Sequence, residues 1–191
     1  VLVLECRKPS AIRRKVSFGE AVFDGISSVE GVTGRLIEDV SECQKVWEAG
    51  EIPILVDETG KVIKELRPDA LIDAILAKRN LGTTREMAPL TVALGPGFEA
   101  GKDVDFVIET QRGHNLGRVI EEGTATPNTG IPGVIAGYGK ERVIHSPAAG
   151  IMHNRSKIGD IVEKDQIIAM VDATPVFYVA LSVMDMKCRK A

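Results

Sequence analysis

The sequence predicts an α/β protein in which a layered, parallel sheet is followed by a smaller region of short strands. Short, continuously apolar runs at residues 1–4, 52–56 and 90–94 each end at an acid or a glycine, as buried parallel strands do. A helix-like segment precedes the second run, and such alternation is typical of parallel sheets. After Arg118 the apolar runs shorten and are separated by turn residues, which indicates β-structure without long helices.

The first run predicts an interior parallel strand that ends at Glu5. In dinucleotide-binding folds, an acid at the end of the second strand holds ribose hydroxyls. The glycine-rich turn that follows the first strand of such folds is not in this sequence. We therefore expect a Rossmann-like sheet that lacks its first strand. Arg13 follows Glu5 closely, where it would meet a phosphate or simply solvate a loop.

The segment between the first two apolar runs predicts two helices and a strand. In order, these are a short helix at residues 16–23 that ends at Gly25, a strand at 29–37, and a helix that Ser41 caps and Gly50 ends. Trp47 shares a helix face with Cys43, so we expect it to pack in the core. The strand at 52–56 is closed by a turn at 57–60.

Residues 68–78 are compatible with either a helix or a strand. Leu71, Ile72, Ile75 and Leu76 match a helical stripe, but periodicity alone does not decide between the two. Asp69 and Asp73 fit a site at the end of a strand or the first turn of a helix equally well.

The stretch at residues 89–118 is the strongest candidate for a ligand site. A buried strand runs into Gly95-Pro96-Gly97, where backbone N–H groups can approach a ligand, and hydrogen-bonding side chains follow. The same residues also suit plain turns. The proposed ligand-binding residues are Gly95, Gly97, Asp103, Arg112, His114 and Asn115, with Glu5 and Arg13 nearby. Catalytic residues stay unknown, since no nucleophile elbow, phosphate loop or HExxH motif is present.

Composition argues against several functional classes. The net charge of −3 carries no basic block, which is unlike a nucleic-acid-binding protein. The three cysteines are widely separated and the three histidines have no regular ligand spacing, so neither a disulfide framework nor a metal site is expected. No apolar run approaches the roughly 20 residues that span a bilayer. We expect a cytoplasmic protein that does not bind membranes.

Residues 146–171 resemble one half of a biotinyl/lipoyl barrel-sandwich. They contain Pro-Ala-Ala-Gly, then Gly-Asp, a valine and a tight turn before an apolar strand. In carrier domains of that type the modified lysine lies on the following hairpin, which here is residues 172–175 and has no lysine. The resemblance therefore implies the scaffold without a swinging arm.

Taken whole, the chain resembles the selenium-dependent molybdenum hydroxylase maturation (YqeB-like) family. The resemblance rests on residues 8–22 (KPSAIRRKVSFGEAV), 52–57 (IPILVD), 68–83 (PDALIDAILAKRNLGT), 87–120 and 128–138 (NTGIPGVIAGY), with the barrel-like segment. It implies an accessory role in loading the molybdopterin cofactor of a client molybdenum hydroxylase. Whether the chain is itself an enzyme stays open, and so does whether it self-associates. The identity of a bound cofactor is also open, and the resemblance suggests a molybdopterin or a nucleotide.

Two other functions are compatible with the same residues. One is an NAD(P)-dependent oxidoreductase of the Rossmann type, and the other is a non-catalytic module that docks the client hydroxylase. The expected regions are a Rossmann-like part at 1–86, a central glycine-loop and β region at 87–139, and a partial barrel-sandwich-like region at 140–191.

Overall fold

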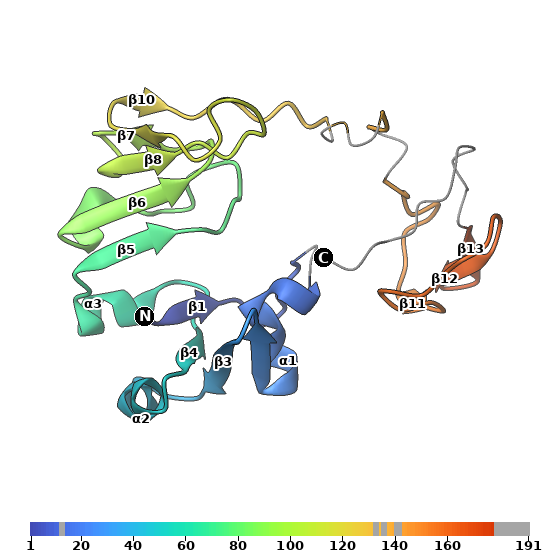
Figure 1. The fold of residues 1–191 in the computed structure, drawn as a ribbon, viewed down its shortest axis with the longest axis horizontal. Helices are drawn as coiled ribbons and strands as arrows, with labels where there is room; N and C mark the ends of the chain where they lie inside the picture. The colour runs from blue at the N-terminus through green and yellow to red at the C-terminus, as the bar shows by residue number, and fades with distance from the viewer. Residues whose placement is uncertain (12–13, 132–133, 135–136, 140–142, 178–191) are drawn as a thin grey trace. The chain divides into compact units, whose positions relative to one another are not determined.

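The computed structural model describes residues 1–11, 14–131, 134, 137–139 and 143–177. The chain divides into two compact units, Val1–Pro127 and Asn128–Ala191. The described residues form a mixed α/β structure with several sheets and few helices (Figure 1). Of the helices in the described ranges, none has the length and apolar character needed to cross a membrane.

A four-stranded sheet is built from the first third of the chain. Its order is β1 (Val3–Glu5), β4 (Ile52–Val56), β3 (Val32–Ile37) and β2 (Ile26–Val29). β1 and β3 run parallel to β4, while β2 forms an antiparallel hairpin with β3. The sequence predicts an interior strand at residues 1–4, but β1 lies at the edge of the described sheet and its residues are half-buried. The central β4 is the buried strand, as its unbroken apolar run indicates.

Three short α-helices accompany this sheet: α1 (Ala21–Asp24), α2 (Cys43–Glu48) and α3 (Lys61–Leu66). Short 3₁₀ turns precede α1 at Arg14–Val16 and Phe18–Glu20, and α2 at Val40–Glu42. Gly25 ends α1 in a left-handed conformation, with φ of 78°, as the sequence predicts.

The start of the α2 segment differs from the prediction. Asp39, not Ser41, is the capping residue: its carboxylate accepts a hydrogen bond from the Ser41 N–H at 2.9 Å, and Glu42 accepts one from the Asp39 N–H at 3.1 Å. Asp39 is extended, with φ of −141°, which is the conformation a capping residue needs.

Trp47 also departs from the prediction, since its side chain is 41% exposed. Its indole N–H donates to the Val1 carbonyl at 2.7 Å. The inward face of α2 is formed by Cys43 and Val46, and the residue after Val46 is turned by about 100° around the helix axis. Because Val46 faces the core, the next residue, Trp47, is directed away from it.

A second four-stranded sheet has the order β5 (Ala70–Asp73), β6 (Leu90–Leu94), β8 (Phe106–Ile108) and β9 (Val119–Ile120). β5, β6 and β8 are parallel and β9 is antiparallel to β8. The sequence is compatible with either a helix or a strand at residues 68–78, and the structure forms the strand β5 there. Ile72 and Ile75 of its helix-like stripe are more than half exposed, at 63% and 65%. A 3₁₀ turn at Arg85–Met87 precedes β6, and β7 (Glu99–Ala100) pairs with β10 (Gly123–Thr124).

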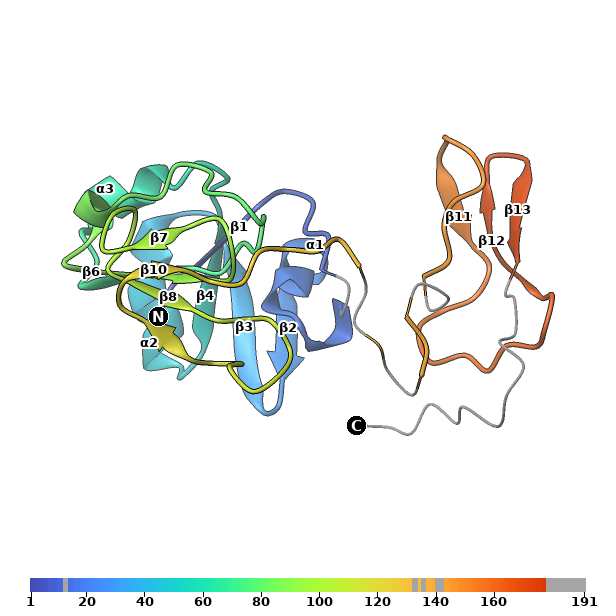
Figure 2. The ribbon, with the colours of Figure 1, turned by 90° about the horizontal axis from the view of Figure 1, so that it is seen from above.

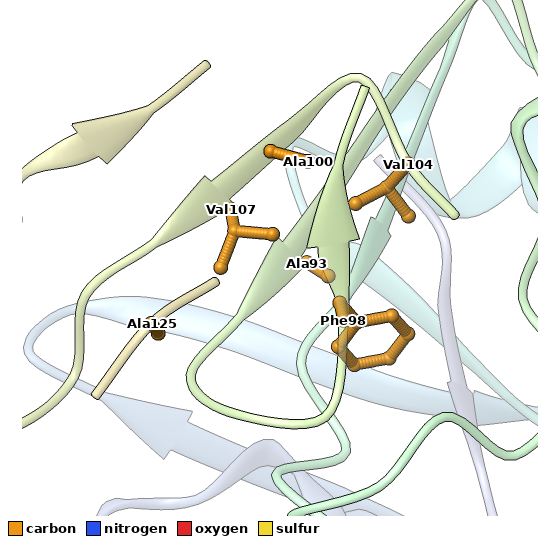
Figure 3. Packing of buried hydrophobic residues seen from close by; sticks show 6 residues of the cluster. All are labelled: Ala93, Phe98, Ala100, Val104, Val107 and Ala125. Carbon is orange, nitrogen blue, oxygen red and sulfur yellow. The ribbon is translucent and has the colours of Figure 1, made fainter. Parts of the chain in front are cut away.

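Each of the two sheets has its own buried cluster. The first contains Ile37, Cys43, Val46, Leu55 and Val62. The second contains Ala93, Phe98, Ala100, Val104, Val107 and Ala125, which Figure 3 shows gathered around β6 and β8. Phe98, Ala100, Val104 and Ala125 lie outside the four strands of that sheet. Their burial therefore ties the segments that carry them to the second sheet.

The second unit contains a three-stranded antiparallel sheet. β12 (Ile167–Val171) lies between β11 (Met152–Asn154) and β13 (Thr174–Phe177), as Figure 2 shows. The turn between β12 and β13 lies where the sequence predicts a hairpin, and Asp172 in it has a positive φ of 49°. Ala169, Val171 and Val176 form a small core. The described strands of this unit do not close into a barrel.

Candidate functional site

Three loops leave the same edge of the second sheet. Because β5, β6 and β8 are parallel, their carboxyl ends lie together, with Asp73 opposite Ala93 and Leu94 opposite Ile108 (Figure 1). The loops that follow are residues 74–84, 95–98 and 109–118. Ligands of open parallel sheets bind at this kind of edge. This carboxyl edge is therefore the first place to look for a site.

The loops at this edge are basic. Residues 74–84, 95–98 and 109–118 contain a single acid, the buried Glu109, whereas the whole chain has a net charge of −3. They carry the basic residues Lys78, Arg79, Arg112 and Arg118, together with His114. Within the described ranges, none of these side chains forms an ion pair. The carboxyl edge therefore has positive charge that the protein itself does not neutralise.

In contrast to the unpaired cations of the carboxyl edge, two cations near the opposite edge of this sheet form ion pairs. Arg85 and Lys102 lie in segments that lead into the amino ends of β6 and β8. Arg85 contacts Asp105 at 2.6 Å and Lys102 contacts Glu99 at 3.0 Å. Asp105 also accepts hydrogen bonds from the N–H and hydroxyl of Thr91, at 2.8 and 2.9 Å. The amino edge is thus a closed structural network.

Two buried carboxylates hold the loops of the carboxyl edge in place. Glu109 is 4% exposed and accepts hydrogen bonds from the Gln111 N–H at 2.7 Å, the Thr126 N–H at 2.8 Å and the Thr126 hydroxyl at 2.7 Å. Asp73 accepts from the Ile75 N–H at 3.1 Å and the Thr83 hydroxyl at 2.6 Å. Since their oxygens are occupied by the protein, these two acids position loops and leave the cations free for a ligand.

The hydrogen bonds to Glu109 favour its charged form. Burial alone raises the pKa of a carboxyl group, but the N–H groups of Gln111 and Thr126 and the Thr126 hydroxyl outweigh burial and lower the pKa of Glu109 below its usual value. The loop after β8 is therefore held by an ionised carboxylate at neutral pH.

The glycines of the 95–97 turn serve close packing between these loops. Gly95 has φ of 79°, its N–H donates to the Ile108 carbonyl at 2.8 Å, and a Cβ on it would lie 2.6 Å from the Thr110 hydroxyl. Gly97 has φ of 112°, and a Cβ there would lie 2.5 Å from the Arg79 Cα. The sequence predicts that these glycines open the backbone to a ligand. In the structure, the space beside both of them is filled by neighbouring loops.

A cavity of about 590 Å³ lies beside the loop after β8. Its polar lining consists of Glu109, Asn115, Arg118, Glu121, Glu122, Thr124 and Thr126. Of the residues that the sequence proposes as ligand-binding, only Asn115 lines this cavity. Arg112 and His114 are exposed on the same loop but do not line it.

The remaining proposed residues lie elsewhere. Asp103 lies in the turn before β8, where its carboxylate accepts from the Glu99 N–H at 2.9 Å. Glu5 ends β1 of the first sheet, where burial raises its pKa. Arg13 lies outside the described residues. The structure thus places Gly95, Gly97, Arg112, His114 and Asn115 at one edge, but it does not bring Asp103 or Glu5 to that edge.

Sequence reasoning missed Lys78, Arg79 and Arg118 as members of this edge. The signal is the excess of basic over acidic residues in the loops after three parallel strands, and it becomes visible only once residues 70–73 are recognised as a strand. Among the described residues there is no group of three or more His, Cys, Asp or Glu side chains arranged to hold a metal ion.

Comparison with known proteins gives one relationship of high identity. The chain is 53% identical over 171 residues to a protein described as uncharacterized protein YqeB, from Escherichia coli strain K12. The alignment covers 90% of this chain and 32% of that protein, so the chain spans about a third of the length of this relative. No protein-family model matches the chain. No solved structure matches it either.

Proposed function

We propose that the chain is part of an accessory protein for the maturation of selenium-dependent molybdenum hydroxylases, and that the carboxyl edge of β5, β6 and β8 binds a molybdopterin-type or nucleotide-like anion. The observation that carries the ligand class is the charge of the three loops, which hold four Lys or Arg residues and one acid, Glu109, whose carboxylate is hydrogen-bonded within the protein. Cations without a protein partner attract an anion more strongly than cations already held in ion pairs.

The adjacent cavity suits a ligand that has a polar ring as well as an anionic group. Its volume of about 590 Å³ is in the range of small-molecule sites. Arg118 on its wall offers a planar, two-pronged donor to a phosphate. Asn115, Glu121 and Glu122, which also line the cavity, offer oxygens to ring N–H donors. Molybdopterin and purine nucleotides both combine a donor-bearing ring with phosphate, which supports this pair of ligands over a simple inorganic anion.

The maturation role rests on the resemblance of the long motifs at residues 68–83 and 87–120 to the YqeB-like family, and the chain is similar to YqeB of E. coli, a protein described as uncharacterized. Because the chain spans about a third of that relative, the role is proposed for the longer protein. In this arrangement the carboxyl edge holds the ligand, while the client hydroxylase is contacted by surfaces that are still to be mapped.

Removing single cations from the carboxyl edge is expected to weaken ligand binding. Arg118→Ala, Arg112→Ala and Arg79→Ala should each raise the Kd for molybdopterin, GTP or NAD about tenfold, because each removes a charge-assisted contact of about 1.5 kcal/mol. Calorimetric titration of the three probes measures this and ranks the ligands. A marked preference for NAD would favour the oxidoreductase alternative over the maturation role.

Lys102→Ala is the matched control, because Lys102 is exposed on the same sheet but belongs to the amino edge and is already paired with Glu99. It should leave all three affinities unchanged. Equal affinities in the wild type, the control and the three arginine variants would remove the carboxyl edge as the site. The maturation role is checked separately, by the activity that a client hydroxylase gains when it is assembled with the wild-type or the Arg118→Ala full-length protein.

A further inference from the structure

The second sheet has one face that the chain covers and one that it leaves open. Side chains alternate between the two faces along each strand, and residues paired in register point to the same face. The face that carries Asp73, Thr91, Ala93 and Val107 is buried, and we call it the inner face. The opposite, outer face is apolar throughout and consists of Ala70, Ile72, Leu90, Val92, Leu94, Phe106, Ile108 and Val119.

The outer face is open to solvent. Ile72, Val119 and Leu90 are 63%, 52% and 39% exposed. None of the eight outer residues belongs to a buried hydrophobic cluster in the described part of the chain. The other large side chains of this face are half-buried: Val92, Leu94, Phe106 and Ile108. Because parallel sheets are normally covered on both faces, an open apolar face on such a sheet indicates a surface that packs against another element.

The connections between the parallel strands explain why only the inner face is covered. β5, β6 and β8 follow one another across the sheet, and right-handed crossovers that advance in one direction lie on one face. Phe98 of the second crossover packs in the cluster on the inner face (Figure 3), and the Thr83 hydroxyl of the first donates to Asp73 on that face. Residues 74–89 and 95–105, all of which the structure describes, contain no α-helix that could cover the outer face.

The size of the outer face favours a cover from the same polypeptide over a second molecule. Four strands about 4.8 Å apart, of which β6 is the longest with five residues, give a face of about 15 by 17 Å. This footprint of about 250 Å² is far below the roughly 800 Å² that each partner contributes to a stable protein–protein interface. It matches one α-helix, which is about 10 Å wide and needs about eleven residues to cross 17 Å. A helix in the same chain does not lose the entropy of association, so a face of this size is enough to hold it.

We infer that the outer face is covered by an amphipathic α-helix from another part of the same, longer polypeptide. The chain aligns with 32% of the length of its E. coli relative, so the greater part of such a protein is available to supply the helix. A face that is apolar throughout selects a helix with an apolar stripe, whose residues are spaced three and four apart. With this helix in place, the parallel strands are buried on both faces, as is usual for such sheets.

Cysteine accessibility tests the inference. Ile72→Cys and Leu90→Cys are made separately in the 191-residue chain and in the longer protein; Val119, which also lines the cavity beside the loop after β8, is left unchanged. Modification by a maleimide, followed at each site by peptide mass spectrometry, should be fast in the chain and about tenfold or more slower in the longer protein, where the helix has to open first. Lys102→Cys is the control, because Lys102 is exposed in the turn before β8 and is not part of the outer face. It should react equally fast in both proteins.

A photo-crosslinker attached at the same two positions identifies the cover. In the longer protein, both positions should cross-link to one segment outside residues 1–191, with apolar residues spaced three and four apart. Equal maleimide rates in the two proteins at positions 72 and 90 would overturn the inference. Cross-links that join two copies of the protein, or that reach only residues 1–191, would overturn it as well. Thermal melting checks that each variant is folded, and since the two positions lie on different strands, one variant suffices if the other does not fold.

Discussion

Replacing Glu109 with alanine is expected to lower the free energy of unfolding by about 3 kcal/mol, because it leaves buried N–H groups without an acceptor. The carboxylate receives three hydrogen bonds from Gln111 and Thr126, and Thr126 lies 17 residues further along the chain. Glu109 is only 4% exposed, so these hydrogen bonds are made where the carboxylate itself is shielded from solvent. Urea denaturation of the wild type and the variant measures the difference. Glu121→Ala, at an exposed position beside the same cavity, should change stability by less than about 0.5 kcal/mol.

The pH dependence of stability gives an independent check on the charge of Glu109. Its folded-state pKa lies below the usual value, so its contribution is present above the pKa of the unfolded chain and is lost as pH falls through the folded pKa. Glu109→Gln keeps the shape and removes the titration. The stability gap between wild type and Glu109→Gln should therefore be widest near neutral pH and shrink on acidification. A gap that stays constant down to acid pH would contradict the assigned role.

The strands that could be predicted from the sequence are those with short apolar runs between strong turn signals. β4 and β6 lie where residues 52–56 and 90–94 predict them, and the turn at residues 57–60 follows β4. In these segments local composition and burial agree, because a central parallel strand is covered on both faces.

Local reasoning failed where a distant partner decided the outcome. The segment at residues 68–78 has a helical stripe, yet β5 forms because Ala70 to Asp73 pair with Leu90 to Ala93 of β6. Trp47 is a large apolar residue on the helix face of Cys43, which predicts a core position, but its indole N–H donates a hydrogen bond to the Val1 carbonyl at the surface. Neither partner is visible within a window of a few residues.

The sequence points to the edge of the sheet at which the candidate site is proposed, but it identifies only some of the residues at that edge. A glycine turn at the end of a buried strand points to the carboxyl edge of β6, and Arg112, His114 and Asn115 do lie on a neighbouring loop. Arg79 and Arg118 join that edge only through the strand order β5-β6-β8-β9. Glu109 is part of the same stretch of sequence, but its structural role depends on Thr126, which sequence spacing does not connect to it.

Gly97→Ala is expected to destabilise the first unit by about 3 kcal/mol, because it combines backbone strain with overpacking. The φ of 112° disfavours any residue with a Cβ. The new Cβ would lie 2.5 Å from the Arg79 Cα, 2.6 Å from its N and 2.8 Å from its C. These are backbone atoms, so a change of rotamer cannot relieve the contact. Thermal and urea denaturation measure the loss.

Gly82→Ala separates the two contributions, since Gly82 has a similar φ of 126° but no atom within 4 Å of the position of an added Cβ. It carries the backbone strain alone, which amounts to about 1–2 kcal/mol.

The loop that must yield to the methyl group added at Gly97 contains Arg79, and it already holds Leu76 and Lys78 at positive φ, 57° and 63°. Displacing it moves a cation of the carboxyl edge, so Gly97→Ala should weaken anion binding as well as stability, whereas Gly82→Ala should weaken stability more than binding. Equal losses of stability in the two variants would show that the loops have room to separate and that the close approach at Gly97 does not hold the edge together.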